Sequence, residues 1–316
     1  MLAAALAAWA MAGSTACAGA VTLPNTAPAQ PEAMPRRVVS LDLCTDEMLA
    51  AYGAREPGLR ARVAALSPLW RRLRGGRGVP GSHRAGAVDL TGWPVHDGSL
   101  EQILGLHPDL ALVGPYNALL LRQRLTALGV RVQVLPLPQR LSGIAPYEQR
   151  LLAALGLPAS LAARADGTDG ADAPPNASPN ASPDPPQNAP RLLLLGANGI
   201  GTGTQTLEGD ILTRAGWRNY VQAPGYVALD LERVATDPPD AVLWAAPASP
   251  ALANRFAEHP AMQRAVPASR WLTLADAWRW ACPGPWSWDL VRELSRAREQ
   301  LLGERPTNHA NGARLR

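Results

Sequence analysis

The sequence feature that most constrains the fold is a helix–turn–strand unit that occurs twice. One copy spans residues 99–112 and the other spans residues 230–243. Each copy has a helix-capping residue, then Leu-Glu and a β-branched residue, then Pro-Asp and an apolar run, so that Glu101 aligns with Glu232. A chain that repeats this unit is expected to form two similar lobes, and two lobes enclose a cleft in which a ligand can bind.

Predicted strands and helices alternate along most of the chain. Its 316 residues are enough for two domains of ordinary size. Apolar runs predict strands at 37–41, 63–66, 110–113, 130–135, 191–195 and 271–274, and helical patterns separate most of them. This alternation predicts an α/β fold with a largely parallel sheet in each lobe.

Composition and pattern divide the chain into seven expected segments. We expect a signal peptide at 1–20, a flexible leader at 21–35, an N-terminal lobe at 36–142, a linking helix at 143–165, a disordered Pro/Asn/Ala insertion at 166–190, a C-terminal lobe at 191–303 and a tail at 304–316. Gly156 and Pro158 indicate a break in the linking helix. A lipid anchor on Cys17 is the alternative to simple cleavage of the signal peptide. We favour simple cleavage, because Ser14 stands where a lipobox normally carries Leu.

The charged residues exclude several classes of function. All 30 basic residues are arginine, so the chain has no lysine for a Walker A motif or a Schiff base. The basic residues are spread along the chain, and we interpret the one local run at 71–77 as a solvated loop. Hydrolase, zinc-protease and Cys-x-x-Cys motifs are missing too. We therefore expect neither an enzyme nor a nucleic-acid partner.

Two local features support alternative functions. His83, His96 with Asp97, and His107 could form part of a metal site, which would make the protein a haem or free metal-ion binding protein. The glycine run at 196–203 follows a predicted strand, so an α/β enzyme that uses this loop is a lower-ranked alternative. The glycine spacing departs from that of a dinucleotide-binding motif, which weakens this second alternative.

The cysteines and the repeated glutamates each allow two interpretations. Cleavage of the signal peptide leaves two cysteines, Cys44 and Cys282. In an exported chain they can form a disulfide or remain two buried thiols, and we favour the disulfide. Glu101 and Glu232 lie in the first turn of their helices, where a carboxylate stabilises the helix by about 0.3 kcal/mol or more. Their symmetric placement also suits docking to basic residues of a symmetric partner.

Over roughly residues 36–302 the sequence resembles the periplasmic substrate-binding proteins of ABC importers for vitamin B12 and ferric siderophores. The resemblance is carried by the Arg-Val-Val-Ser-Leu strand at 37–41, the Thr-Asp-Glu that follows at 45–47, and both copies of the repeated unit. It implies two Rossmann-like lobes joined by a single long helix, with a ligand cleft between the lobes.

The same resemblance implies roles for individual residues. Glu101 and Glu232 match the glutamates that contact arginines of the membrane permease, and Tyr116 and Tyr226 match the positions of cleft aromatics. The loops at 42–45 and from Gly196 should also face the cleft. The chain has ten Trp and one Phe, and Trp or Tyr in loops can form rigid walls for a bulky ligand, although packing between helices is the alternative for many of them. The candidate ligand-binding residues are Asp42, Cys44, Trp70, Trp93, Tyr116, Asn198, Tyr226, Trp244, Trp280 and Trp286.

We therefore expect a periplasmic, monomeric, non-enzymatic protein that needs no cofactor. It would capture a metal chelate, either cobalamin or a ferric siderophore, and deliver it to the permease of an ABC importer. Its contact with the membrane would be through the permease or through a lipid anchor.

Overall fold

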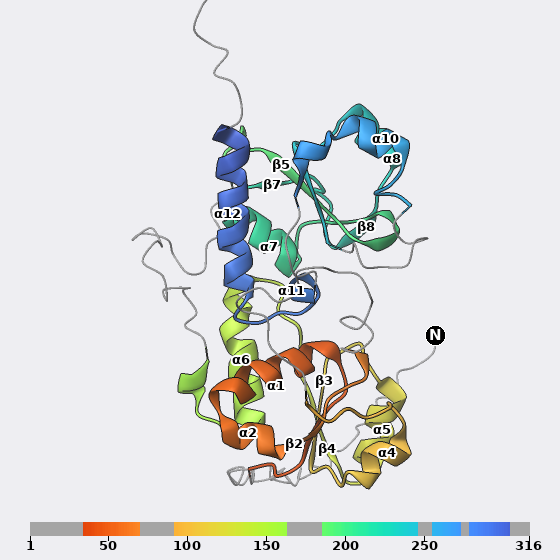
Figure 1. Ribbon diagram of the computed structural model, residues 1–316, viewed down its shortest axis with the longest axis vertical. Helices are drawn as coiled ribbons and strands as arrows, with labels where there is room; N and C mark the ends of the chain where they lie inside the picture. Colours follow the sequence, from red (N-terminus) through yellow and green to blue (C-terminus); the bar gives the residue numbers. More distant parts are fainter. Residues whose placement is uncertain (1–33, 70–91, 163–184, 246–254, 273–277, 304–316) are drawn as a thin grey trace, which may run out of the picture. The chain divides into compact units, whose positions relative to one another are not determined.

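The computed structural model describes residues 34–69, 92–162, 185–245, 255–272 and 278–303 (Figure 1). The predicted signal peptide, most of the leader, Trp70, His83, the arginines at 71–77 and the tail lie outside these residues. Within the described part, no helix is both long and apolar enough to cross a membrane.

The first lobe is built on a four-stranded parallel sheet with the order β2-β1-β3-β4. The strands are β1 (Val38–Ser40), β2 (Val63–Ala65), β3 (Leu110–Val113) and β4 (Arg131–Val134). The two central strands, β1 and β3, are buried on both faces, which is why they read as short apolar runs and not as alternating patterns.

Helices cover both faces of this sheet (Figure 1). One face carries α1 (Leu43–Arg55), α2 (Pro57–Arg62) and α6 (Ile144–Ala154), and the other carries α4 (Leu100–Gly105) and α5 (Leu119–Ala127). Alternate residues of β3 belong to the two cores, because Leu110 and Leu112 pack with α1 and α6 whereas Ala111 and Val113 pack with Ile103 of α4.

The second lobe contains a six-stranded mixed sheet with the order β10-β9-β5-β6-β8, and β7 also pairs with β5. The strands are β5 (Arg191–Leu195), β6 (Ile200–Thr202), β7 (Arg218–Asn219), β8 (Tyr226–Ala228), β9 (Ala241–Trp244) and β10 (Trp271–Leu272). β6 runs antiparallel to both β5 and β8, whereas the other pairs are parallel.

This second sheet is also covered on both faces (Figure 1). One face packs against α7 (Leu207–Arg214) and α12 (Ser287–Gly303), and the other against α8 (Leu231–Thr236) and α10 (Pro260–Ala265). A short helix, α11 (Trp278–Ala281), precedes α12. Both lobes thus have the α/β architecture that the alternating strand and helix patterns predict.

The expected linking helix at 143–165 is wrong in its extent. The α-helix ends at Ala154, and Gly156 follows it in the left-handed conformation at φ 66°. Glycine adopts this conformation without the steric cost of a Cβ, and Pro158 prevents the helix from continuing. The last six residues of the expected disordered insertion, 185–190, form a turn that is closed by the hydrogen bond from the Ala189 N–H to the Pro186 carbonyl oxygen at 2.8 Å, and residues 166–184 lie outside the described part of the chain.

Candidate functional site

The two copies of the repeated unit perform the same structural task in their lobes. The Pro-Asp aspartate of each copy accepts a hydrogen bond from the main chain where the first strand of its lobe begins. Asp109 accepts from the Arg37 N–H at 3.0 Å, and Asp240 accepts from the Arg191 N–H at 2.8 Å. The sequence repeat includes both aspartates, but it does not indicate their hydrogen-bond partners. Arg37 lies 72 positions from Asp109 and Arg191 lies 49 positions from Asp240, too far apart for a local sequence pattern to pair them.

The repeated glutamates remain exposed at the start of short helices. Ser99 caps α4 and accepts a hydrogen bond from the Gln102 N–H at 3.2 Å, and Asp230 caps α8 and accepts one from the Glu232 N–H at 2.9 Å. The capping task therefore belongs to Ser99 and Asp230. The carboxylates of Glu101 and Glu232 make no hydrogen bond or ion pair with the described residues, which leaves both of them available to a partner.

Asp42 holds two loops together and does not project into a site. It is 1% exposed and caps α1 by accepting hydrogen bonds from the N–H groups of Cys44 (2.8 Å) and Thr45 (3.1 Å). Its other oxygen accepts from the Gly114 N–H, directly after β3. Burial raises the pKa of this carboxyl, and the hydrogen bonds partly oppose that effect.

Tyr116 lies two residues beyond Gly114, and its side chain is 86% exposed. Its loop is fastened from two sides. Asp42 binds the Gly114 N–H, while the guanidinium of Arg122 on α5 donates to the carbonyl oxygens of Gly114 and Pro115, both at 3.2 Å. The backbone of this loop is therefore held in place while the tyrosine ring stays exposed. Arg122 had no signal in the sequence that would have assigned it this task.

Tyr226 is the corresponding exposed aromatic residue of the second lobe. It begins β8, and its side chain is 63% exposed. Its hydroxyl donates to both carboxylate oxygens of Glu208, at 3.0 and 3.2 Å. Partial desolvation raises the pKa of Tyr226, and the negative charge of Glu208 and the hydrogen bond raise it further.

Three of the candidate tryptophans belong to the hydrophobic cores. Trp93, Trp280 and Trp286 are 5%, 8% and 7% exposed. Trp93 packs under the guanidinium of Arg60, 5.0 Å from the ring centre, and the indole N–H of Trp286 donates to the Cys282 carbonyl oxygen at 2.7 Å. Core packing is the alternative that the sequence allows for such residues, and the structure places these three in the cores.

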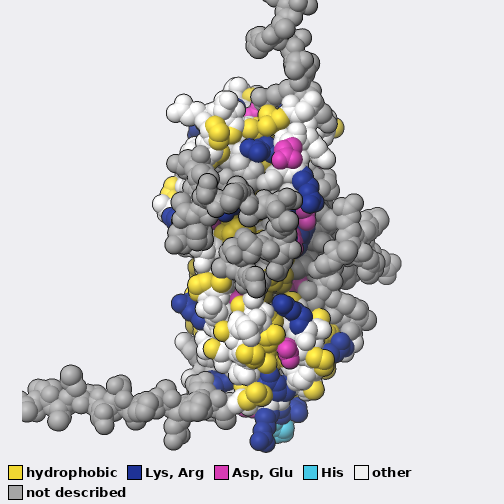
Figure 2. Space-filling model, turned by 90° about the vertical axis from the view of Figure 1, so that its left-hand side faces the viewer, with side chains coloured by type: hydrophobic (Ala, Val, Ile, Leu, Met, Phe, Trp, Pro, Cys, Tyr) yellow, Lys and Arg dark blue, Asp and Glu magenta, His cyan; other side chains and the backbone are white. Residues whose placement is uncertain are grey.

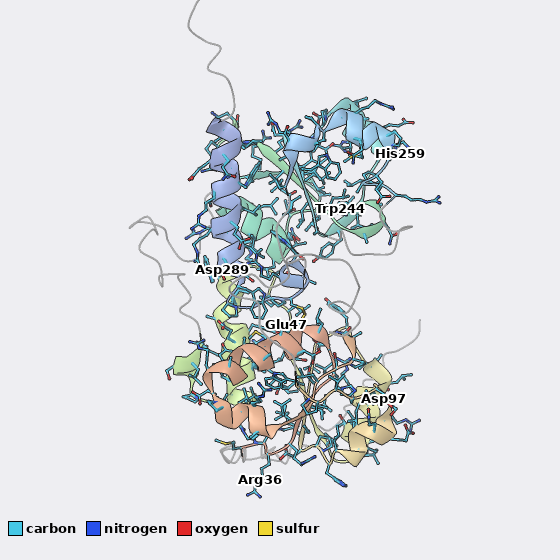
Figure 3. The ribbon with its side chains drawn as sticks, viewed as in Figure 1. Arg36, Glu47, Asp97, Trp244, His259 and Asp289 are labelled. Atoms are coloured by element: carbon cyan, nitrogen blue, oxygen red, sulfur yellow. A yellow bond between two sulfur atoms is a disulfide. The ribbon has the colours of Figure 1, made fainter. Side chains whose placement is uncertain are left out.

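Trp244 and Asn198 lie near the carboxyl ends of neighbouring strands. Trp244 ends β9 (Figure 3). Its ring packs edge-to-face on that of Trp271, with ring centres 6.4 Å apart. Its indole N–H is buried and has no hydrogen-bond partner within the described residues. Asn198 is exposed in the turn after β5, in the left-handed conformation at φ 57°.

Cys44 and Cys282 form a disulfide, with their Cα atoms 4.9 Å apart. Cys282 is 1% exposed and, with Trp286, belongs to the core of the first lobe. The segment that leads into α12 is therefore fixed to α1 by a covalent bond as well as by packing. A cystine has no free thiolate, so Cys44 cannot act as a nucleophile or as a metal ligand while this bond is intact.

His96 cannot serve as the metal ligand that the alternative hypothesis needs. It is 3% exposed, and its Nδ1 accepts from the Gly98 N–H at 3.0 Å, which leaves the proton on Nε2 to be donated to the Ser40 carbonyl oxygen at 2.8 Å. Burial lowers the pKa of His96. Within the described residues, no group of three His, Cys, Asp or Glu side chains could hold a metal ion.

The glycine run after β5 does not form a phosphate-binding turn. It passes through a single 3-10 turn (Ala197–Gly199) into the antiparallel strand β6 and does not lead into an α-helix whose N-terminus could receive a phosphate. Close packing explains two of the glycines: a Cβ at Gly201 would lie 2.7 Å from the Leu229 side chain, and a Cβ at Gly203 would clash with the Ala223 carbonyl oxygen. The nucleotide-binding interpretation of this loop therefore loses its structural basis.

Arginines supply the positive charge of the surface. Because the chain has no lysine, every dark-blue side chain in Figure 2 is arginine, and these occur at several separate places on the face shown. Among the candidate site residues, those that the structure leaves exposed are the aromatic Tyr116 and Tyr226 and the polar Asn198.

Neither a protein-family model nor a curated protein sequence matches the chain. Solved structures do match it. A periplasmic heme binding protein from Pseudomonas aeruginosa is 22% identical, with a TM-score of 0.58 over 83% of this chain and 92% of the other. The chain has the fold of the two-lobe periplasmic binding proteins.

Other binding proteins have the same fold. The periplasmic heme binding protein HutB of Vibrio cholerae is 16% identical, with a TM-score of 0.57 over 83% of this chain and 98% of the other. The periplasmic vitamin B12 binding protein BtuF of Vibrio cholerae is 18% identical, with a TM-score of 0.52 over 85% and 98%. The alignments therefore extend over both lobes of these proteins.

Proposed function

We propose that the protein is a periplasmic solute-binding protein that captures a metal chelate and delivers it to an ABC-type importer of the inner membrane. The observation that carries the proposal is the shared fold, which extends over most of this chain and over nearly the whole of binding proteins for heme and vitamin B12. The protein would act as a monomer and without catalysis.

The exposed side chains support this proposal. Tyr116 and Tyr226 offer aromatic rings on fastened segments, and Trp244 and Asn198 lie at strand ends of the second lobe. Parallel α/β sheets bind ligands beyond the carboxyl ends of their strands, which is where Tyr116, Trp244 and Asn198 lie. Trp93, Trp280 and Trp286 are left out of the proposed site because they pack in the cores.

The ligand that we propose is cobalamin or a ferric siderophore. Both are bulky chelates that aromatic rings can hold without a lysine. Haem is the second candidate, and the observation that favours it is the likeness to several heme-binding proteins. Free metal ions are disfavoured because both ring nitrogens of His96 are engaged.

Delivery to a permease is supported by the two exposed glutamates on equivalent helices. Glu101 of α4 and Glu232 of α8 occupy equivalent places in the two lobes, and they have no partner within the described residues. A disulfide between Cys44 and Cys282 is consistent with an oxidising compartment such as the periplasm. The predicted signal peptide that would direct export lies outside the described residues.

A ligand screen tests the proposed function. The purified mature protein is titrated with cyanocobalamin, a ferric hydroxamate siderophore, haemin, and zinc and nickel ions, with thermal stabilisation and tryptophan fluorescence as readouts. We expect saturable stabilisation by one chelate, because a ligand that binds the native state raises Tm by mass action. Stabilisation by the free ions alone, or by none of the probes, would overturn the proposal.

A further inference from the structure

The segment that carries Tyr226 is joined to the start of α7 by a small set of main-chain contacts. Tyr226 of β8 pairs with Thr202 of β6, and the chain then passes through Gly203 and Thr204 toward α7. The Gly203 N–H donates to the Gly225 carbonyl oxygen at 2.8 Å, and the Gly225 N–H donates to the Thr204 carbonyl oxygen at 2.8 Å. These bonds fix the first turn of α7 beside Tyr226.

That first turn presents a carboxylate to the tyrosine. Thr206 caps α7 by accepting from the Gly209 N–H at 3.0 Å, and its own hydroxyl donates to the Gly203 carbonyl oxygen at 2.8 Å. Glu208 lies two residues after the cap, and its carboxylate oxygens accept the hydrogen bond of the Tyr226 hydroxyl at O···O distances of 3.0 and 3.2 Å. The side chain of Tyr226 is 63% exposed, yet a hydrogen bond to a partly buried carboxylate fixes its orientation.

The other exposed tyrosine is held differently. Arg122 and Asp42 fasten the main chain of the Tyr116 loop, but the Tyr116 hydroxyl has no hydrogen-bond partner within the described residues. Tyr116 therefore offers both its ring and a free hydroxyl. Tyr226 offers its ring and a hydroxyl oxygen that can still accept a hydrogen bond, because its one proton is already donated to Glu208.

We propose that Glu208 is a positioning residue that fixes the ring of Tyr226 by accepting the hydrogen bond of its hydroxyl, so that Tyr226 contacts the ligand through its ring and not as a metal ligand. This inference rests on the proposed function. It implies that the part of the ligand beside Tyr226 is an apolar or flat organic surface and not the metal. A bond from a phenolate oxygen to the metal would have to come from Tyr116.

The first part of the test needs no ligand. Ultraviolet absorbance is titrated with pH for the wild type, Glu208→Gln and Glu208→Ala, and the Tyr226 component is taken from the difference with Tyr226→Phe. Tyr220→Phe is the matched control, because the Tyr220 hydroxyl donates to the main-chain oxygen of Asp237 at 3.0 Å. We expect Glu208→Gln, which removes the charge and keeps the acceptor, to move the Tyr226 phenolate to a lower pH. An unchanged Tyr226 titration would overturn the inference.

The second part measures dissociation constants with cyanocobalamin, the ferric hydroxamate and haemin. We expect Tyr226→Ala to weaken binding by about tenfold, which is ~1.4 kcal/mol of lost ring contact. Glu208→Ala and Tyr226→Phe should weaken it by about threefold, Glu208→Gln by less, and Tyr220→Phe should not change it. A ferric charge-transfer band that disappears in Tyr226→Phe, or a loss in Tyr226→Phe as large as in Tyr226→Ala, would overturn the inference. If no probe binds the wild type, the proposed function fails, whereas the titration still decides the role of Glu208.

Discussion

Removal of the disulfide should destabilise the protein strongly, and the structure gives the expected size of the effect. The perturbation is the double substitution Cys44→Ala with Cys282→Ala. The two cysteines are separated by 238 positions in the sequence. Closing a loop of this length removes conformational entropy from the unfolded chain that corresponds to about 5 kcal/mol at 25 °C.

Packing keeps part of the contact when the bond is absent. Cys282 and Trp286 are buried in the core of the first lobe, and the Trp286 indole still donates to the main chain at residue 282. We therefore expect a folded variant whose free energy of unfolding falls by about 3–5 kcal/mol. A domain of this size loses roughly 2–4 °C of Tm per kcal/mol, so that Tm should fall by about 10 °C.

The assay is thermal and urea unfolding of the mature protein, with and without a phosphine reductant. Wild type in reductant should match the double variant, and the double variant should be insensitive to reductant, which separates loss of the bond from loss of packing. Thiol labelling under denaturing conditions should detect no free thiol in the oxidised wild type. Two labelled thiols per chain, or a loss below about 1 kcal/mol, would refute the reasoning.

Two further predictions concern charge. Glu101→Arg with Glu232→Arg should abolish ligand uptake by cells and leave the dissociation constant unchanged, whereas Glu258→Arg, at another exposed glutamate of the second lobe, should leave both unchanged; normal uptake by the double variant would contradict the docking role. Burial raises the pKa of Asp46 from 3.8 to about 7, so the folded protein holds the Asp46 proton more tightly than the unfolded chain does. The stability that this proton binding contributes is complete below pH 3.8 and is lost as the pH rises toward 7. The decline in the free energy of unfolding between pH 4 and pH 8 should therefore be smaller in Asp46→Asn than in the wild type, and equal declines would show that Asp46 ionises normally.

The sequence predicted the elements whose cause is local. The apolar runs of β1 and β3 are buried on both faces, and Ser99 and Asp230 cap their helices as the pattern of the repeat indicates. Gly156 and Pro158 marked the place where the expected linking helix ends, although the predicted boundaries extended beyond it. Short-range rules decide such features, because the relevant groups lie within one turn of each other.

The candidate site was harder to predict because its residues depend on distant contacts. Asp42 was expected to contact ligand, but it binds the Gly114 N–H, which lies 72 residues away in the chain. The tryptophans of the sequence do not differ in local pattern, and only tertiary packing separates buried Trp280 from half-buried Trp244. The Glu208–Tyr226 bond likewise joins residues from a helix and a strand whose pairing the sequence did not indicate.

The core of the first lobe is completed late in synthesis. Cys282 and Trp286 belong to this core, although its other buried members lie between Val38 and Leu155. At roughly 5–20 residues per second, the ribosome needs about 10–50 s to pass from Cys44 to Cys282. During this interval the first lobe lacks both side chains, and in a reducing cytosol it lacks the bond as well. In the proposed periplasmic role, the first part of the chain would therefore reach the membrane before this core and its disulfide are complete.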